Sequence, residues 1–117
     1  MFACKYCRYA EKYGYSTFHV EHIRPLKHNG SNESDNLAYS CPPCNRAKGS
    51  NIGTYLNASS RFTRLFNPRI DKWMDHFESI DRVIVSKSTV GEATVAVLDM
   101  NSLPRILERR KVALMEK

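Results

Sequence analysis

The pattern of apolar and polar positions in the first fifty residues predicts a strand, a loop, a second strand and a helix. Residues 17–23 are rich in β-branched and aromatic side chains, which favour a strand, and Pro25 ends it because proline lacks the amide hydrogen that a sheet ladder needs. Residues 37–40 predict a short second strand. A helix is expected over residues 42–48, because prolines suit its first turn and Gly49 is placed to end it.

The segment between the two strands, residues 27–36, consists almost entirely of side chains that favour turns. Its sharpest bend is expected at Asn29 and Gly30. We therefore expect a surface loop here.

The second half of the chain predicts helices and at least one further strand. Residues 82–87 alternate as in a strand, and residues 89–100 carry one apolar helical stripe. Ser102 and Pro104 predict the start of a last helix that continues to the C-terminus. A further apolar set has helical spacing and is expected to pack: Trp73, Phe77 and Ile80. The predicted fold class is α+β.

The length of 117 residues and the hydrophobic content of 42% indicate one small domain, near the size at which a metal or disulfide helps stability. There is no run of 18 apolar residues and no charged-then-apolar leader, so we expect no membrane span and a cytoplasmic, intracellular protein.

The net charge of +6 is concentrated in the first part of the chain. Residues 1–69 hold ten Lys or Arg and four Asp or Glu, whereas residues 70–117 hold eight of each kind. A basic surface of this type favours a polyanion such as nucleic acid, although a merely solvated basic face remains the alternative.

All cysteines lie in two Cys-x-x-Cys pairs, Cys4 with Cys7 and Cys41 with Cys44. Two such pairs can complete a closed four-thiolate zinc site, which is structural because no ligand position stays open. The alternatives are two disulfides or free core thiols, and the missing secretory signal favours zinc. The zinc would clamp the two ends of an insert that contains Glu21, His22 and Asn36.

These segments resemble the HNH nuclease family, whose ββα-metal core has an acidic-His-Ile-x-Pro strand, an Asn-Leu pair and a Cys-x-x-Cys-Asn-x-x-Lys helix. The matching segments, in order, are Glu21 to Pro25, Asn36-Leu37 and Cys41 to Lys48. Residues 65–69, Trp73, His76-Phe77 and 91–101 also resemble a tail that follows this core in one group of the family. The resemblance implies one nuclease domain over residues 1–117, with a zinc-clamped core at 1–53 and a supporting extension of short strands and two helices at 54–117.

The resemblance also implies roles for individual residues. His22 would be the general base, Glu21 and Asn45 would bind a catalytic divalent ion, and Asn36 would pin the loop that aims His22. The chemistry is consistent, because imidazole can deprotonate water near neutral pH and a hard cation such as Mg²⁺ or Mn²⁺ stabilises phosphate charge. Taken alone, His22 would more often be an ordinary strand histidine.

One geometric difficulty arises from the strand, since neighbouring residues point to opposite faces. Glu21 and His22 can both enter one site only if the strand bends or ends there, as Pro25 would allow. His19 shares a face with Glu21 and is a further candidate metal or phosphate ligand, with a packed or surface imidazole as the alternative.

Three basic residues are candidate nucleic-acid contacts, with simple solvent exposure as the alternative: Arg24, Arg46 and Lys48. His76 is expected to support the structure.

Three functions compete: a metal-dependent DNA endonuclease, a zinc-stabilised nucleic-acid-binding module without activity, and a zinc-knuckle protein-interaction domain. A base beside two hard-metal ligands favours the endonuclease. Its substrate would be double-stranded DNA, with a homodimer or partner protein required if both strands are cut.

Overall fold

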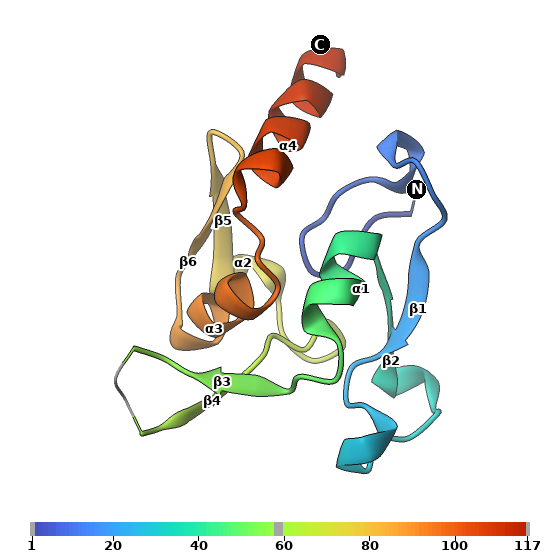
Figure 1. Cartoon of the computed structure of the whole chain (residues 1–117), viewed down its shortest axis with the longest axis vertical. Helices are drawn as coiled ribbons and strands as arrows, with labels where there is room; N and C mark the ends of the chain where they lie inside the picture. Colours follow the sequence, from blue (N-terminus) through green and yellow to red (C-terminus); the bar gives the residue numbers. More distant parts are fainter. Residues whose placement is uncertain (1, 58–59, 117) are drawn as a thin grey trace.

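The computed structural model describes residues 2–57 and 60–116. Its strands are β1 (His19–His22), β2 (Leu37–Ser40), β3 (Gly53–Tyr55), β4 (Phe62–Arg64), β5 (Phe77–Ile80) and β6 (Val83–Ser86). Its α-helices are α1 (Pro42–Lys48), α2 (Trp73–His76), α3 (Thr89–Val97) and α4 (Leu103–Met115), and 3₁₀ turns lie at η1 (Glu11–Tyr13), η2 (Leu26–His28) and η3 (Ser34–Asn36). The α+β prediction is confirmed (Figure 1).

The predicted strand, loop, strand and helix are present at the start of the chain. β1 and β2 pair antiparallel with His19 opposite Ser40 and His22 opposite Leu37. α1 follows directly, with two prolines in its first turn, where a missing amide hydrogen costs nothing. Gly49 ends it at φ 50°, a conformation that glycine adopts without strain.

Each remaining strand pair also forms an antiparallel hairpin, β3 with β4 and β5 with β6. The second pair corrects one expectation. Phe77 and Ile80 do not continue the helix begun at Trp73, because the chain leaves α2 after one turn and enters β5. Asp81 and Arg82 both have positive φ, 51° and 68°, which makes the tight turn that returns the chain as β6. The strand expected at residues 82–87 and both C-terminal helices are confirmed.

The two halves of the chain share one core. Its buried side chains come from the first cysteine pair, β2, α1 and the extension, among them Tyr6, Phe66, Phe77, Leu98 and Met100. Trp73 Nε1 donates to the Tyr6 carbonyl oxygen at 2.7 Å, which joins α2 to the first cysteine pair. Across the described ranges, no helix combines the length and apolar character that crossing a membrane requires.

Candidate metal centre and active site

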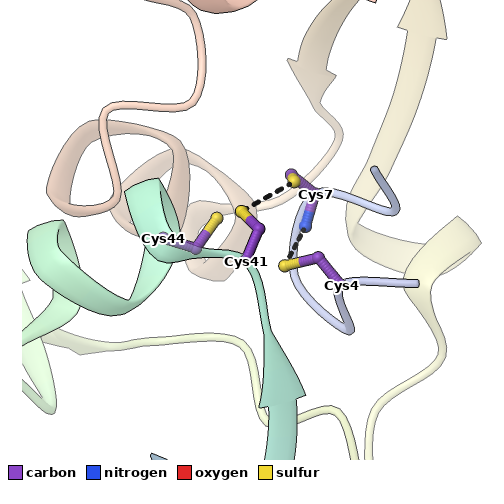
Figure 2. Close-up of side chains that lie close together, drawn as sticks. All are labelled: Cys4, Cys7, Cys41 and Cys44. Atoms are coloured by element: carbon purple, nitrogen blue, oxygen red, sulfur yellow. Dashed lines mark hydrogen bonds between the residues drawn. The ribbon is translucent and has the colours of Figure 1, made fainter. Parts of the chain in front are cut away.

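The four cysteines gather at one buried point between the N-terminal loop and the start of α1. Figure 2 shows their side chains pointing toward one another, two from residues 4–7 and two from residues 41–44. The four sulfur atoms lie within 4.8 Å of one another, and all four thiols are free. Cys7 Sγ and Cys41 Sγ are 3.6 Å apart, which excludes a disulfide between them. The arrangement can hold a metal ion.

Local backbone geometry explains how the first pair presents its sulfurs. The Cys7 amide donates to Cys4 Sγ at 3.5 Å, and the Arg8 amide donates to the Cys4 carbonyl oxygen at 2.9 Å. Arg8 has φ 67°, so the chain turns away immediately after Cys7. On the other side, Cys41 is the residue before the first turn of α1, and the helix carries Cys44 one turn further.

The electrostatics of this cluster favour a bound cation. Contacts with Cys4 and the other sulfurs, together with burial, raise the pKa of the Cys44 thiol far above its usual range, because several thiolates cannot ionise so close together. One positive side chain already faces the cluster. Arg105, from α4, donates through Nη2 to Cys44 Sγ at 3.0 Å and lies 3.8 Å from Cys41 Sγ.

Glu21 lies on the face of β1 that is covered by α1. Only 8% of it is exposed, its Oε2 is 4.0 Å from Lys48 Nζ, and its Oε1 makes no hydrogen bond within the described residues. Burial raises the pKa of Glu21, and the nearby Ser40, Lys48 and His19 offset only part of this effect. Glu21 is therefore a buried carboxylate with one oxygen available to a ligand.

Lys48 is almost fully buried, with 1% exposure. Its Nζ donates to the His22 carbonyl oxygen at 3.1 Å and faces Glu21. Burial lowers its pKa, while the charge of Glu21 acts in the opposite direction. A side chain in this position supports the end of β1, and it does not present its charge to an incoming phosphate as the sequence suggested.

His22 is half-buried at the end of β1, and its ring contacts the loop. Its Nε2 lies 2.7 Å from Asn32 Oδ1. The side-chain amide of Asn36 fixes that loop through three hydrogen bonds. Its Oδ1 accepts from the Arg24 amide at 2.9 Å, and its Nδ2 donates to the carbonyl oxygens of Arg24 and Ser31 at 2.9 and 2.7 Å. The contact of Asn32 was missed from sequence, because nothing in a turn-rich segment distinguishes one asparagine from another.

The ladder stays regular through His22, which still pairs with Leu37. Glu21 and His22 therefore face opposite sides of the hairpin, and the bend that Pro25 was expected to allow begins only after β1. Among the described residues, the four cysteines are the only group of three or more His, Cys, Asp or Glu side chains whose ligand atoms cluster closely enough for a metal. The acidic and histidine side chains of β1 do not form a second such group.

The remaining candidates lie around the hairpin. Asn45 is half-buried on α1, one turn before Lys48, and its side-chain amide has no hydrogen bond in the described part of the chain. Arg46 is exposed on the same helix, and His19 is exposed on the Glu21 face of β1. Arg24 is exposed, with Nε donating to the His28 carbonyl oxygen.

Two residues of the extension also bear on the site. Arg69 Nε donates to the Leu37 carbonyl oxygen at 2.9 Å, and Arg69 lines an open polar groove together with Arg24 and Asn36. His76 Nδ1 lies 2.6 Å from Ser88 Oγ, the residue that caps α3, and its Nε2 is 3.9 Å from Asp71 Oδ1. These contacts join His76 to the residue that caps α3 and to Asp71, both within the extension.

Comparison with known proteins gives a match at the level of the family. The HNH endonuclease family model matches residues 4–51, the segment that holds both cysteine pairs, the β1–β2 hairpin and α1. Neither the curated proteins nor the solved structures contain a match to the chain. Residues 4–51 are therefore similar to the HNH endonuclease family, and this matched segment contains the buried four-cysteine cluster that can hold a metal ion.

Proposed function

We propose that this chain is a metal-dependent endonuclease that hydrolyses phosphodiester bonds in DNA. The observation that carries the proposal is the family match over residues 4–51 together with the free Glu21 oxygen, His22 and Asn45, which lie within that segment. A purely structural hairpin has no need for a buried carboxylate with an unbonded oxygen, since such a group costs about 1–3 kcal/mol.

The four cysteines would hold a structural zinc ion. Thiolate ligands in a tetrahedral set suit Zn²⁺, and four protein ligands leave no open position for chemistry. The free thiols of a reduced cluster also suit the cytoplasmic location that we propose for the protein.

A second cation, of the hard type that prefers oxygen ligands, would bind beside the β1–β2 hairpin. Glu21 and Asn45 would hold it, because Oε1 of Glu21 is unbonded and the Asn45 amide oxygen has no other partner among the described residues. When bound, Mg²⁺ or Mn²⁺ would stabilise negative charge on the phosphate and on the leaving oxygen. Few protein ligands suit such an ion, since it keeps waters and takes other oxygens from phosphate.

His22 would take a proton from the attacking water. With Asn32 Oδ1 as the acceptor, Nε2 carries the ring hydrogen, and Nδ1 keeps a lone pair that can receive the proton. Asn36 holds Ser31 beside Asn32, and Lys48 holds the His22 carbonyl oxygen, so both act as positioning residues. Arg24 and Arg46 would contact DNA phosphates from the exposed side.

The same geometry supports one alternative. Glu21 and His22 face opposite sides of the hairpin, as they would in a zinc-stabilised DNA-binding module without activity. Catalysis requires the scissile phosphate to lie across the end of β1, where both faces can be reached. One base and one metal cut one strand, so cleavage of both strands of a duplex would require a second copy or a partner protein.

Incubation of the purified chain with supercoiled plasmid, with and without Mg²⁺ or Mn²⁺, tests the proposal. We expect metal-dependent nicking, a loss of about 100-fold or more for His22→Ala, and a loss of about 10-fold for Asn32→Ala. The two losses should not multiply in the double variant, because Asn32 acts through His22. His28→Ala is the matched control in the same loop and should keep full activity. DNA binding without metal-dependent cleavage would favour the inactive binding module.

A further inference from the structure

The β3–β4 hairpin extends away from the rest of the molecule as a two-stranded ribbon (Figure 1). Its base is fixed, because α3 packs against both strands and the Leu65 amide donates to the Ile52 carbonyl oxygen at 3.0 Å. Thr54 and Thr63 are half-buried and lie opposite each other in the ladder, whereas the aromatic residues next to them, Tyr55 and Phe62, are exposed.

Those aromatic residues form an exposed pair. Tyr55 and Phe62 lie opposite each other in the ladder, with ring centroids 5.5 Å apart and planes at 75°. Tyr55 is 59% exposed and Phe62 is 49% exposed. The Phe62 ring also lies against Gly53, where a Cβ would come within 2.6 Å of it. Glycine thus allows the ring to lie close against β3, and the pair is held in place without being buried.

The sequence segment that contains the ribbon carries basic residues and no acidic residue. Residues 36–70 contain five Lys or Arg and no Asp or Glu. Arg61 is exposed and directly precedes Phe62, and Arg64 is half exposed at the ribbon's base, where Asp71 of the extension pairs with it. An exposed aromatic pair on strands that carry arginine and no acidic residue is compatible with a polyanion, which a surface rich in carboxylates would repel.

We propose that the β3–β4 ribbon is a DNA-binding element. Tyr55 and Phe62 would contact bases or sugars of the duplex that is cut at the proposed active site on the β1–β2 hairpin. The proposal rests on the proposed nuclease function and names the part of the chain that engages the substrate beyond the cutting site. A two-stranded β-ribbon has the dimensions of the DNA major groove, where apolar contact with thymine methyl groups supplies binding energy that does not depend on phosphate charge. The ribbon starts four residues after Gly49, which ends α1, so it leaves the body next to the helix that carries Asn45 and Lys48.

The test measures binding of the full chain to a fluorescein-labelled 30-base-pair duplex by anisotropy, without added Mg²⁺ or Mn²⁺, over a range of salt concentrations. The variant is Tyr55→Ser with Phe62→Ser. It should weaken binding by about 10- to 100-fold at every salt concentration and leave the salt dependence unchanged, because no phosphate contact is removed. The matched control is Tyr15→Ser, which removes a 92% exposed tyrosine between η1 and β1 and should change nothing.

Each other outcome has a distinct meaning. If the wild-type chain binds DNA and the double variant binds equally well, the ribbon proposal is overturned while the nuclease proposal stands. If the wild-type chain binds no DNA, the proposed function fails and the ribbon proposal fails with it. If the double variant keeps its DNA affinity but loses self-association in sedimentation, the aromatic pair is a contact between two copies of the chain, and the ribbon proposal is overturned. Thermal melting of both variants checks that the exposed substitutions leave the fold intact.

Discussion

At the scale of single residues, Glu21 is a buried carboxylate whose charge is only partly compensated by its neighbours. It is buried, one of its oxygens has no hydrogen bond, and its ion pair with Lys48 is long at 4.0 Å. Burying a carboxylate under these conditions opposes folding unless a cation arrives. A divalent cation bound to Glu21, as proposed above, would offset this cost.

This cost leads to a prediction about stability and pH. Burial raises the pKa of Glu21, so the folded chain keeps its proton to higher pH than the unfolded chain does. Stability from this group is complete below its unfolded pKa and is lost as pH rises through the folded pKa. Glu21→Gln should therefore raise the melting temperature at pH 7 without Mg²⁺ by a few degrees, and should flatten the loss of stability as pH rises above the usual range of a glutamate pKa.

Calorimetric or fluorescence melting of wild type, Glu21→Gln and the exposed loop control Glu33→Gln would check this. Added Mg²⁺ should stabilise the wild type and the control but not Glu21→Gln. A Glu21→Gln chain that melts below the wild type at pH 7 without metal would contradict the assignment.

At the scale of elements, the loop between β1 and β2 holds the end of β1 more firmly than its composition suggests. Asn29 occupies the left-handed region at φ 64°, and the Gly30 amide donates to the Pro25 carbonyl oxygen. A Cβ on Gly30 would lie 1.6 Å from the Arg24 carbonyl oxygen and 2.9 Å from Asn36 Nδ2. Glycine at this position lets Asn36 reach the backbone that supports His22.

Gly30→Ala should therefore displace the loop and separate Asn32 from His22. We expect plasmid nicking to slow by about 10-fold or more and amide exchange in residues 24–36 to accelerate, because the clash is with backbone and has no easy relaxation. Asn29→Gly is the neighbouring control and should keep activity, since glycine adopts positive φ freely. Unchanged exchange and activity in Gly30→Ala would show that the loop does not support the base.

At the scale of the whole molecule, the four-cysteine centre connects segments from both ends of the chain. It takes sulfurs from the N-terminal loop and from α1, and Arg105 joins it from α4. Arg105 also donates to the carbonyl oxygens of Leu98 and Asp99, which fixes the start of α4. Four thiolates around Zn²⁺ carry a net charge of −2, so a buried guanidinium beside Cys44 offsets part of that charge.

Removal of zinc should therefore unfold the core and also loosen the attachment of α4. We expect one zinc per chain, and unfolding of the core by Cys41→Ser. Arg105→Gln should accelerate zinc transfer to a chromogenic chelator by about 10-fold and reduce exchange protection over Leu103–Met115. Arg110→Gln, which removes only an exposed pair with Asp81, is the control on the same helix. Equal zinc-transfer rates for the two variants would rule out the role given to Arg105.

The sequence by itself determined the parts of this protein that depend on neighbouring residues. The strand before Pro25, the turn-rich loop, and the helix between Pro42 and Gly49 follow from local backbone preferences, and the structure confirms them. The spacing of the cysteine pairs predicted one shared cluster, because two residues between thiols suffice to bring both to one point. The family positions could be named for the same reason, since they lie in short contiguous motifs.

Tertiary structure alone decided which of these side chains meet. Lys48 is buried against His22, Asn32 rather than its neighbours contacts the imidazole, and Arg105 reaches Cys44 across 61 positions of sequence. The helical spacing of Trp73 and Phe77 gave the wrong element at Phe77, because the Asp81-Arg82 turn allows a hairpin that buries Phe77 fully. Local propensity is a weak preference that packing overrides, and contacts between distant segments exist only once the chain has closed around its core.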